Sequence, residues 1–400
     1  MKYFEILKKD QKSKARLGVI HTAHGDVHTP YFNPIGTKGT VKSVTSEELK
    51  FWGAEMILAN TYHLWQRPGD ALIYKAGGLH AFMNWKQAIF TDSGGYQVFS
   101  LAKMRQVMEV GVLFRFDMDG RAEILSPEKS IQIQSNLGSD VALILDDFPG
   151  YPFEYERTKQ AIEQTTRWAE RAVSEYLKIM TAGDPINPGQ KLWGIVQGAS
   201  FPDLREQSAK EIRALDFPGY AIGGVAVGEP TEDMLKAVDM AIPHLEEDKP
   251  KHLLGVGTPY DIVQAVARGC DSFDCVIPTR EARHGRLYIS ARDSSGKDSY
   301  KTIDIRKAEF AEDFTPVDNE CDCYGCLNHT RGYIRHLFAA QEALSIRLAT
   351  MHNIKYYLNL MKKVRTAIEN DYFDDFLAGF KDLTERDSEG NASSPSENAL

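Results

Sequence analysis

Short apolar runs alternate with helix-like amphipathic segments along residues 31–274, and this rhythm constrains the fold more than any other feature. Strands that alternate with helices are typical of parallel sheets joined by right-handed crossovers. Eight strands within roughly 250 residues predict an α/β fold of the (β/α)8 TIM-barrel type, with a doubly wound open sheet as the alternative. The predicted strands cover residues 31–34, 55–59, 88–91, 141–145, 192–196, 220–222, 252–254 and 272–273. The predicted helices include residues 46–52, 127–137, 154–177, 202–215, 231–242 and 259–268.

The predicted strands end on polar residues or glycines, and in a barrel the carboxyl ends of the strands converge on the face where substrates bind. A single acid at a strand end commonly caps the next helix. Three acid positions, two amides and two glycine sites favour a shared pocket instead. The residues are Asn60, Asp92, Asp146 with Asp147, Gln197, Gly223 with Gly224, Gly255 and Asp274.

The segment DSGGYQ at residues 92–97 combines a carboxylate, two glycines and an aromatic ring directly after a predicted strand. Asp92 can do chemistry there, the glycines let the backbone approach a flat ligand, and Tyr96 can cover the face of that ligand. Taken alone, the segment favours a glycine-rich turn capped by aspartate. The polar ends of the other strands shift the interpretation to a ligand pocket.

Five cysteines are an odd number, and three of them crowd into CDCYGC at residues 321–326. This spacing favours thiolate ligands of a metal over a secreted disulfide framework and over buried or redox-active thiols. Cys321, Cys323 and Cys326 would bind zinc together with a fourth Cys or His. The candidates are His329, His336 and His352. We prefer His352, because a helix-borne ligand distant in sequence would pin a whole subdomain. Three sulfurs and one nitrogen predict one structural zinc per chain.

The net charge of −9 argues against indiscriminate nucleic-acid binding, but two stretches are locally basic. Residues 277–307 hold eight Lys/Arg against four Asp/Glu, and residues 331–365 hold seven against one. Both are candidates for a phosphate-contacting face, with ordinary solvated surface as the alternative. No apolar run approaches the roughly 18 residues of a membrane helix, and the start of the chain turns charged before a signal-like region develops. We therefore expect a cytoplasmic protein with no membrane contact.

We divide the chain into four parts. Residues 1–30 are an N-terminal β segment, in which residues 15–30 alternate around a His-Gly turn and predict a β-hairpin. Residues 31–285 are the barrel. Residues 286–370 are the zinc-binding subdomain with closing helices: a polar hairpin at 286–307, whose tip we place within 291–301, then helix patterns at 331–351 and 353–370. Residues 371–400 are the C-terminal end, whose tail from residue 387 is too polar to bury a core and predicts disorder.

Four motifs carry a resemblance to a known family: DSGGYQ at 92–97, GGVAVGE at 223–229, FDCVIPTR at 273–280 and the cysteine cluster. With these motifs the chain, from about Phe4 to about Phe376, closely resembles tRNA-guanine transglycosylase of the bacterial type. The resemblance implies a (β/α)8 barrel with a zinc subdomain, His352 as the fourth zinc ligand, and a homodimer. The implied activity is that of a pentosyltransferase in queuosine biosynthesis, which exchanges guanine at the anticodon wobble position of tRNA for a 7-substituted 7-deazaguanine through a covalent enzyme-RNA intermediate.

The resemblance also implies roles for particular residues. Asp274 corresponds to the nucleophile and Asp92 to the general acid/base, which suits a reaction with oxocarbenium character at a ribose carbon. The implied base-binding residues are Ser93, Tyr96, Asp146, Gln197, Gly223, Gly224 and Leu254. The implied tRNA-binding residues are Arg280, Arg283 and Arg286, and Lys355, Lys362, Lys363 and Arg365 are candidates to extend that contact.

Two positions bear on which base is accepted. Phe148 stands where the bacterial family commonly has cysteine, and a bulky ring beside Asp146 would reshape the pocket. Val227 matches enzymes that use the small aminomethyl precursor, so we expect 7-aminomethyl-7-deazaguanine rather than queuine. The rival functions are a barrel glycosidase or nucleoside hydrolase, for which two carboxylates suffice, and a noncatalytic RNA-binding protein with a zinc module.

Overall fold

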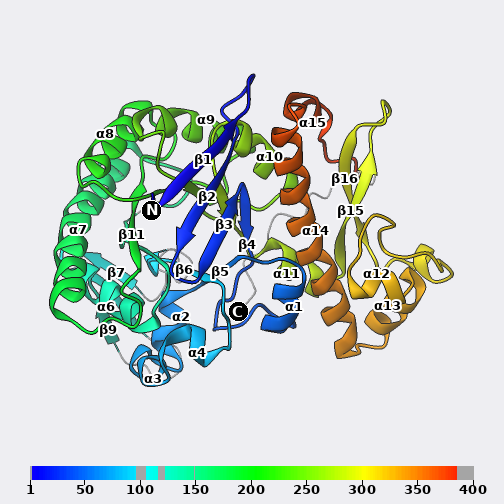
Figure 1. Ribbon diagram of the computed structural model, residues 1–400, viewed down its shortest axis with the longest axis horizontal. Coiled ribbons are helices and arrows are strands. Elements are labelled where there is room, and N and C mark those ends of the chain that lie inside the picture. Colours follow the sequence, from blue (N-terminus) through cyan, green and yellow to red (C-terminus); the bar gives the residue numbers. More distant parts are fainter. Residues whose placement is uncertain (1, 96–104, 116–121, 148, 385–400) are drawn as a thin grey trace.

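Eight parallel strands form a nearly closed barrel in the computed structural model, which describes residues 2–95, 105–115, 122–147 and 149–384 (Figure 1). From the second to the last, each of the eight strands pairs with the next one in chain order, and the last pairs back with the first. A bridge between Ile35 and Leu58 links the remaining edges. The predicted barrel is confirmed, because an open sheet would lack the pairing of first and last strands. The strands are β4 (Tyr31–Asn33), β5 (Met56–Ala59), β6 (Ala88–Thr91), β10 (Val141–Leu143), β11 (Lys191–Val196), β12 (Tyr220–Ile222), β13 (Lys251–Leu253) and β14 (Ser272–Asp274).

The barrel helices begin where the sequence supplies capping residues. The Thr45 side chain forms a reciprocal capping box with Glu48 at the start of α1. Ser126 and Thr258 cap α6 and α10, each followed by proline at the first helical position. All six helices predicted for this region are confirmed to within a few residues at their ends, whereas α2, α3, α4 and α11 were not predicted. The helices are α1 (Ser46–Phe51), α2 (Thr61–Gln66), α3 (Asp70–Lys75), α4 (Gly78–Phe82), α6 (Pro127–Leu137), α7 (Tyr155–Ala182), α8 (Pro202–Arg213), α9 (Thr231–Ala241), α10 (Pro259–Ala267) and α11 (Ile277–Arg283).

A three-stranded antiparallel sheet lies in the foreground of Figure 1 and covers the N-terminal end of the barrel. Its strands are β1 (Phe4–Lys9), β2 (Arg16–Thr22) and β3 (Gly25–Thr29). The predicted hairpin is confirmed as β2 and β3, and β1 is an additional strand. The buried guanidinium of Arg16 holds this sheet to the barrel, because its Nε and Nη2 donate to the two oxygens of Asp271 at 2.8 and 2.6 Å, directly before β14.

A second antiparallel sheet, which the sequence analysis did not predict, is inserted between β6 and α6. It contains β7 (Arg105–Met108), β8 (Gly111–Arg115) and β9 (Ala122–Leu125). Helix α7 holds the β7–β8 turn: Trp168 Nε1 and Arg171 Nη1 donate to the carbonyl of Glu109 at 2.9 and 2.8 Å.

The C-terminal part packs on one side of the barrel through the long helix α14 (Figure 1). Its elements are β15 (Arg286–Arg292), β16 (Asp298–Asp304), α12 (Tyr324–Asn328), α13 (Arg331–Ala339), α14 (Ala343–Glu369) and α15 (Phe373–Gly379). The predicted hairpin is confirmed, with exposed residues at 294–296 in its tip. The predicted helix boundary at residue 352 was wrong. The break comes earlier, where Gln341 adopts a left-handed backbone with φ of 57°, and α14 then runs unbroken through His352.

Helix α14 bonds to three parts of the molecule. Asn353 donates to the carbonyls of Pro278 and Arg286 at 3.0 Å each, Tyr357 Oη donates to Gly257 O at 2.5 Å, and Arg365 Nη1 donates to Pro30 O at 2.7 Å. The tail from residue 387 that we predict to be disordered lies outside the described residues. Within the described ranges, none of the helices combines the length and apolar character needed to cross a membrane.

Candidate active site and metal-binding cluster

The polar residues that end the barrel strands lie at one end of the barrel, because all eight strands run in the same direction. Asp92 directly follows β6, Gln197 directly follows β11, and Asp274 is the last residue of β14. Three of the predicted base-binding residues, Ser93, Asp146 and Gln197, form one hydrogen-bonded group, and each of the two predicted catalytic acids has its own set of partners. Tyr96 and Phe148 lie outside the described residues.

Asp146 is the centre of the first group. Ser93 Oγ donates to Asp146 Oδ1 at 3.0 Å, and Gln197 Nε2 donates to Asp146 Oδ2 at 2.6 Å. Burial raises the pKa of Asp146 to about 6, although the bonds from Ser93 and Gln197 act to lower it. At neutral pH the carboxylate is therefore ionised and buried, a state that suits it to accept further hydrogen bonds from a ligand.

The glycines beside this group leave no room for a side chain. A Cβ on Gly224 would lie 2.3 Å from Gln197 Oε1, and one on Gly95 would lie 2.4 Å from Asp146 Oδ1. Gly224 also has a φ of +63°, which favours glycine. Gln197 Oε1 is buried without a hydrogen-bond partner among the described residues. Buried polar atoms are rarely left unsatisfied, so this oxygen is a candidate acceptor for a ligand donor.

Arg205, on α8, supports the same loop and was not singled out from the sequence. Its guanidinium is fully buried, and it donates to the carbonyls of Ala199, Gly223 and Gly224 at 2.7, 2.8 and 3.2 Å. Burial lowers its pKa to about 9. The side chain thus fixes the backbone at residues 223–224 from behind.

Glu229 holds the loop that follows Gly224 through hydrogen bonds to its main chain. Its two carboxylate oxygens accept from the main-chain N–H groups of Ala226 and Val227 at 2.5 and 2.9 Å. Leu254, the remaining predicted base-binding residue, is half-buried directly after β13, and its N–H donates to Ile222 O at 3.1 Å.

Asp92 is half-buried and is held by the end of the neighbouring strand. Asn60 Nδ2 donates to Asp92 Oδ2 at 2.6 Å, and the N–H of Thr61 donates to Asp92 Oδ1 at 2.7 Å. Both donors are neutral, and both are fixed at the junction of β5 with α2. The position of the Asp92 carboxylate is therefore defined before any ligand binds.

Asp274 is held by groups on β13 and after it. His252 Nε2 lies 2.9 Å from Asp274 Oδ1, and the N–H of Gly255 donates to the same oxygen at 3.2 Å. His252 was predicted to lie in a strand, and no role was predicted for it. Strands β4 and β5 separate β14 from β6 in the barrel, so Asp274 and Asp92 enter the site from different sides.

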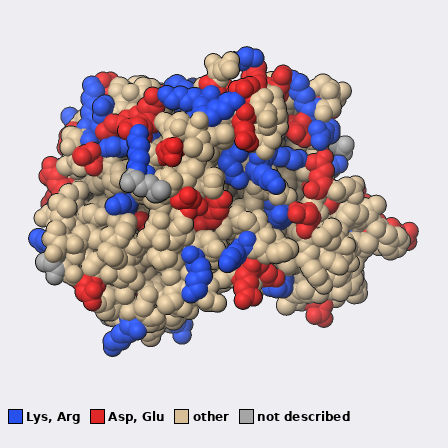
Figure 2. Space-filling view, in the orientation of Figure 1, with Lys and Arg blue, Asp and Glu red and all other residues tan. Residues whose placement is uncertain are grey.

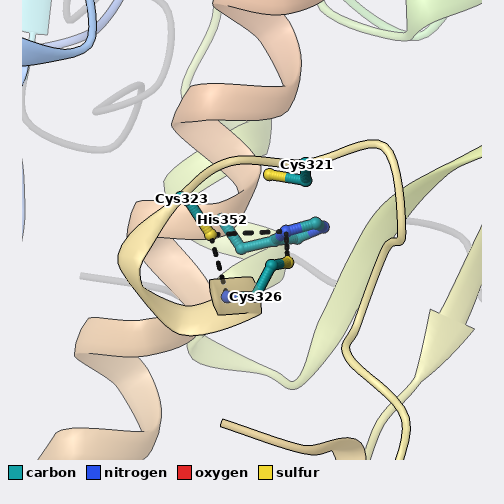
Figure 3. A group of neighbouring side chains, drawn as sticks. All are labelled: Cys321, Cys323, Cys326 and His352. Carbon is teal, nitrogen blue, oxygen red and sulfur yellow. Dashed lines mark hydrogen bonds between the residues drawn. The ribbon is translucent and has the colours of Figure 1, made fainter. Parts of the chain in front are cut away.

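Cys321, Cys323, Cys326 and His352 form a buried cluster whose four candidate ligand atoms all lie within 4.8 Å of one another (Figure 3). His352 Nδ1 lies 3.3 Å from Cys326 Sγ and 3.9 Å from Cys323 Sγ. Its other ring nitrogen, Nε2, donates to Tyr288 O at 2.6 Å, which leaves the Nδ1 lone pair free for a metal. The cluster can therefore hold a metal ion. The other two candidates lie elsewhere: His336 is exposed, and His329 stacks on Tyr333.

Basic side chains gather beside the end of β14. Burial and then the charges of Arg283 and Lys38 lower the pKa of Lys42, and burial and then the charge of Arg280 lower the pKa of Arg283. The pKa of His63 is lowered by burial and by the two lysines. Like charges packed in this way are expected where an anion binds. Lys38, Lys42 and His63 were missed because they follow β4 and β5, far in sequence from the basic stretches.

The other predicted tRNA-binding residues differ in availability. Arg286 and Lys362 are exposed, although Arg286 Nε lies 3.4 Å from a carboxylate oxygen of Glu281. Lys355 pairs with Asp322 at 3.1 Å, and Lys363 pairs with Glu320 at 2.7 Å, so both already have partners within the chain. Figure 2, which views the molecule from the side of the N-terminal sheet, shows Lys and Arg interspersed with Asp and Glu on that face.

A second group of potential ligands, His24, His80 and Asp140, lies at the opposite, N-terminal end of the barrel. The imidazole rings stack with centroids 3.5 Å apart, and His24 Nδ1 lies 2.8 Å from Asp140 Oδ1. His80 Nε2 lies 3.0 Å from Gln87 O, and since a carbonyl only accepts, this nitrogen carries a proton. We interpret the group as a hydrogen-bonded clamp that ties the β2–β3 turn to the barrel.

Comparison with known proteins gives one consistent result. The family model described as queuine tRNA-ribosyltransferase matches residues 10–386. The chain is 50% identical over 377 residues to the queuine tRNA-ribosyltransferase of Listeria welshimeri, which covers 94% of this chain and 95% of the relative. The protein of the same name from Caldanaerobacter subterraneus subsp. tengcongensis is 48% identical, over 94% of this chain and 96% of its own. The queuine tRNA-ribosyltransferase of Streptococcus sanguinis is 50% identical over 94% of this chain and 95% of its own length.

Proposed function

The chain belongs to the queuine tRNA-ribosyltransferase family, and from this membership we propose that it is a tRNA-guanine transglycosylase. It removes guanine from the wobble position of tRNA and inserts 7-aminomethyl-7-deazaguanine, a step in queuosine biosynthesis. The observation that carries the proposal is the buried Asp146 carboxylate, held by Ser93 and Gln197 at the barrel end that also bears Asp92 and Asp274.

Guanine recognition follows from the donors and acceptors of this group. Guanine offers N–H donors at N1 and N2, which the ionised Asp146 accepts, and the buried Gln197 Oε1 is a further acceptor. Gln197 Nε2 uses one of its two N–H groups on Asp146, so the purine O6 can accept from the second N–H or from the main chain at Gly224. Adenine would leave the carboxylate without its donors, and a site built for hydrogen bonds rejects an analogue that lacks them.

The reaction requires a nucleophile and a proton carrier. Asp274 attacks C1′ of the ribose, the C1′–N9 bond breaks, and the electron pair leaves with guanine, which takes a proton from Asp92. The incoming base then loses a proton to Asp92 and displaces the Asp274 carboxylate from C1′. One glycosidic bond is exchanged for another, so no external energy source is needed. Flipping the wobble base out of the anticodon loop costs a few kcal/mol, roughly, and the basic side chains beside β14 offer phosphate contacts.

We assign zinc to the Cys321–Cys323–Cys326–His352 cluster, because three thiolates and one imidazole match the preference of Zn²⁺. Four protein ligands leave no open position, so the metal holds together residues 286–370, which we treat as a zinc-binding subdomain. In this assignment the metal has no part in the chemistry. Tyr288, through its carbonyl, fixes the orientation of the histidine ligand.

We propose that the enzyme is a homodimer and that the zinc-binding subdomain contributes to the contact. Large apolar side chains are exposed on this subdomain: Phe314 is 76% exposed, Leu327 69% and Tyr324 53%. Such exposure on one subdomain is a sign of an interaction surface. A cytoplasmic location, where tRNA is modified and thiolates stay reduced, fits the same assignment.

Exchange of labelled guanine into bulk tRNA tests the proposed function. Label that enters tRNA with wild-type enzyme, but not with Asp274→Ala, supports the transglycosylase. Release of free base without incorporation supports a nucleoside hydrolase instead, and tRNA binding without either reaction supports a noncatalytic RNA-binding protein. Parallel reactions with 7-aminomethyl-7-deazaguanine and queuine identify the incoming base.

A further inference from the structure

His252 is a buried histidine whose two ring nitrogens both contact β14. It is the middle residue of β13 and has no exposed surface. Nε2 lies 2.9 Å from Asp274 Oδ1, and Nδ1 lies 2.8 Å from the hydroxyl oxygen of Ser272. The ring also packs on Phe90, with centroids 4.8 Å apart. Its orientation is therefore fixed by two hydrogen bonds and one aromatic contact.

These contacts define which ring nitrogen carries the proton. An ionised carboxylate can only accept, so the nitrogen that faces Asp274, Nε2, is the donor. In the neutral imidazole Nδ1 is then an acceptor, and the Ser272 hydroxyl donates to it. Gly255 N–H adds a second donor to the same carboxylate oxygen, Oδ1, at 3.2 Å. Both hydrogen bonds thus act on one of the two oxygens of Asp274.

We propose that His252 is a positioning residue that orients Asp274 so that Oδ2, and not Oδ1, attacks the ribose. This inference rests on the proposed function. The Asp274 side chain is 14% exposed, so its carboxylate is held at the edge of the buried core rather than inside it. A nucleophile with one oxygen fixed by two donors presents the other in a defined direction, and such preorganisation lowers the barrier to attack.

The same two donors serve both halves of the exchange. When Oδ2 forms the bond to C1′, the bond to guanine N9 breaks and its electron pair leaves with the base. Oδ1 then becomes the carbonyl oxygen of the ester and keeps its bonds to His252 and Gly255. When the incoming base attacks C1′, the C1′–Oδ2 bond breaks and negative charge returns to the carboxylate. Donors on Oδ1 stabilise this charge and make Asp274 a better leaving group.

Two substitutions separate a positioning role from a purely structural one. His252→Phe keeps a planar ring of similar volume but removes the donor. In His252→Gln, the side-chain amide nitrogen can take the place of Nε2. We expect His252→Phe to lower kcat for guanine exchange about 10- to 100-fold, the loss typical of one hydrogen bond to a charged group. KM for tRNA should stay within about threefold of wild type, and His252→Gln should recover most of the rate.

The readouts are kcat and KM for labelled guanine exchange, the yield of covalent enzyme-tRNA adduct on denaturing gels, and thermal unfolding. His252→Phe with the wild-type kcat overturns the proposal, as does an equal loss of kcat in the phenylalanine and glutamine variants. If His252→Phe fails to fold, Ser272→Ala replaces it. This variant frees Nδ1, should lower kcat several-fold, and overturns the proposal if kcat is unchanged.

A structure of the trapped wild-type adduct tests which oxygen attacks. The ester oxygen bonded to C1′ should be the one remote from His252, and an ester formed through the oxygen that contacts His252 overturns the inference. Wild-type enzyme that incorporates no guanine would instead contradict the proposed function. The two failures are therefore distinguishable.

Discussion

Gln197 donates its side-chain amide to Asp146 at 2.6 Å and so links the ends of the adjacent strands β10 and β11. The bond commits one N–H of the glutamine amide to the carboxylate, and the glutamine oxygen is buried without a partner among the described residues. Two acceptors, Asp146 and Gln197 Oε1, are thus placed together. A purine with adjacent N–H donors matches them, whereas one with acceptors in the same places does not.

Replacing Asp146 with asparagine should abolish guanine recognition. The amide has one acceptor atom instead of two and brings its own donors toward those of the base. We expect a loss of at least about 100-fold in affinity for guanine, since a buried charged acceptor is removed. Isothermal titration with guanine measures it, and Asp147→Asn is the control at the adjacent buried acid. Unchanged affinity in Asp146→Asn would contradict the assignment.

Base binding should depend on pH through Asp146. Burial raises the pKa of this carboxyl to about 6 in the free enzyme, so the ionised acceptor is present above pH 6 and is lost as the pH falls. The affinity for guanine should be constant between pH 7 and 8 and should fall about tenfold per unit well below pH 6. The sign for stability is opposite: because the folded pKa lies above the ordinary value of 3.8, the free enzyme loses stability as the pH rises from 3.8 through 6. A pH-independent affinity between 5 and 8 would show that Asp146 does not titrate in this range.

Arg205 should govern the affinity for the base without touching it. Arg205→Met keeps most of the volume but leaves the carbonyls of Gly223 and Gly224 without their buried donor. We expect KM for the base to rise about 10- to 100-fold, because one or two buried carbonyl groups lose their hydrogen-bond donor. Arg213→Met, at an exposed position on the same helix, is the matched control. Equal kinetics in the two variants would refute a role for Arg205 in holding the loop.

Removing the metal should unfold the subdomain around it. Cys323→Ser should contain no zinc, because one of four ligands is lost, and its stability should fall by several kcal/mol, roughly. Metal analysis and calorimetry measure the two effects. Cys270→Ala removes a buried cysteine outside the cluster and should retain one zinc per chain. A Cys323→Ser variant that keeps its zinc would show that the ligand set is wrong.

The basic residues beside β14 should dominate the salt dependence of tRNA binding. Lys42→Ala combined with Arg283→Ala removes two charges, so affinity should fall and the slope of log K against log salt should decrease by about 1 to 2. Lys2→Ala with Lys178→Ala removes two charges from exposed positions elsewhere and should leave the slope unchanged. Replacing Arg283 and Arg286 together tests the prediction made from sequence alone. An unchanged slope in both double variants would exclude this surface.

The barrel was predictable because its strands are buried on both faces and therefore appear as continuous apolar runs. The whole of β6, for example, is buried. The strand ends were predictable for the same reason, since polar residues begin in the sequence where the buried strand ends. Strand β1 was missed because it lies at a sheet edge, where its exposed positions include the charged Glu5 and Lys9 and the segment resembles charged surface. The division between α13 and α14 was misplaced because the apolar pattern continues across Gln341, whose backbone conformation leaves no signal in the composition.

Arg205, His252 and Lys42 could not be assigned from the sequence because their roles arise from contacts between distant segments. An arginine in the first turn of an amphipathic helix usually lies in solvent. The one available signal was its register: Leu204, Ser208 and Ile212 define the buried face of α8, and Arg205 lies on it. His252 reads as an ordinary strand residue until Asp274, 22 positions later, is placed beside it.

Helix α14 carries the candidate metal ligand His352, the barrel contact Tyr357 and the N-terminal contact Arg365 on a single unbroken helix. One inserted residue would turn everything beyond it by about 100°, since an α-helix has 3.6 residues per turn. Any insertion or deletion between 352 and 365 would therefore misdirect at least one of these side chains. The spacing along this helix is fixed, and tolerance for changes in chain length belongs to loops such as the hairpin tip at 294–296.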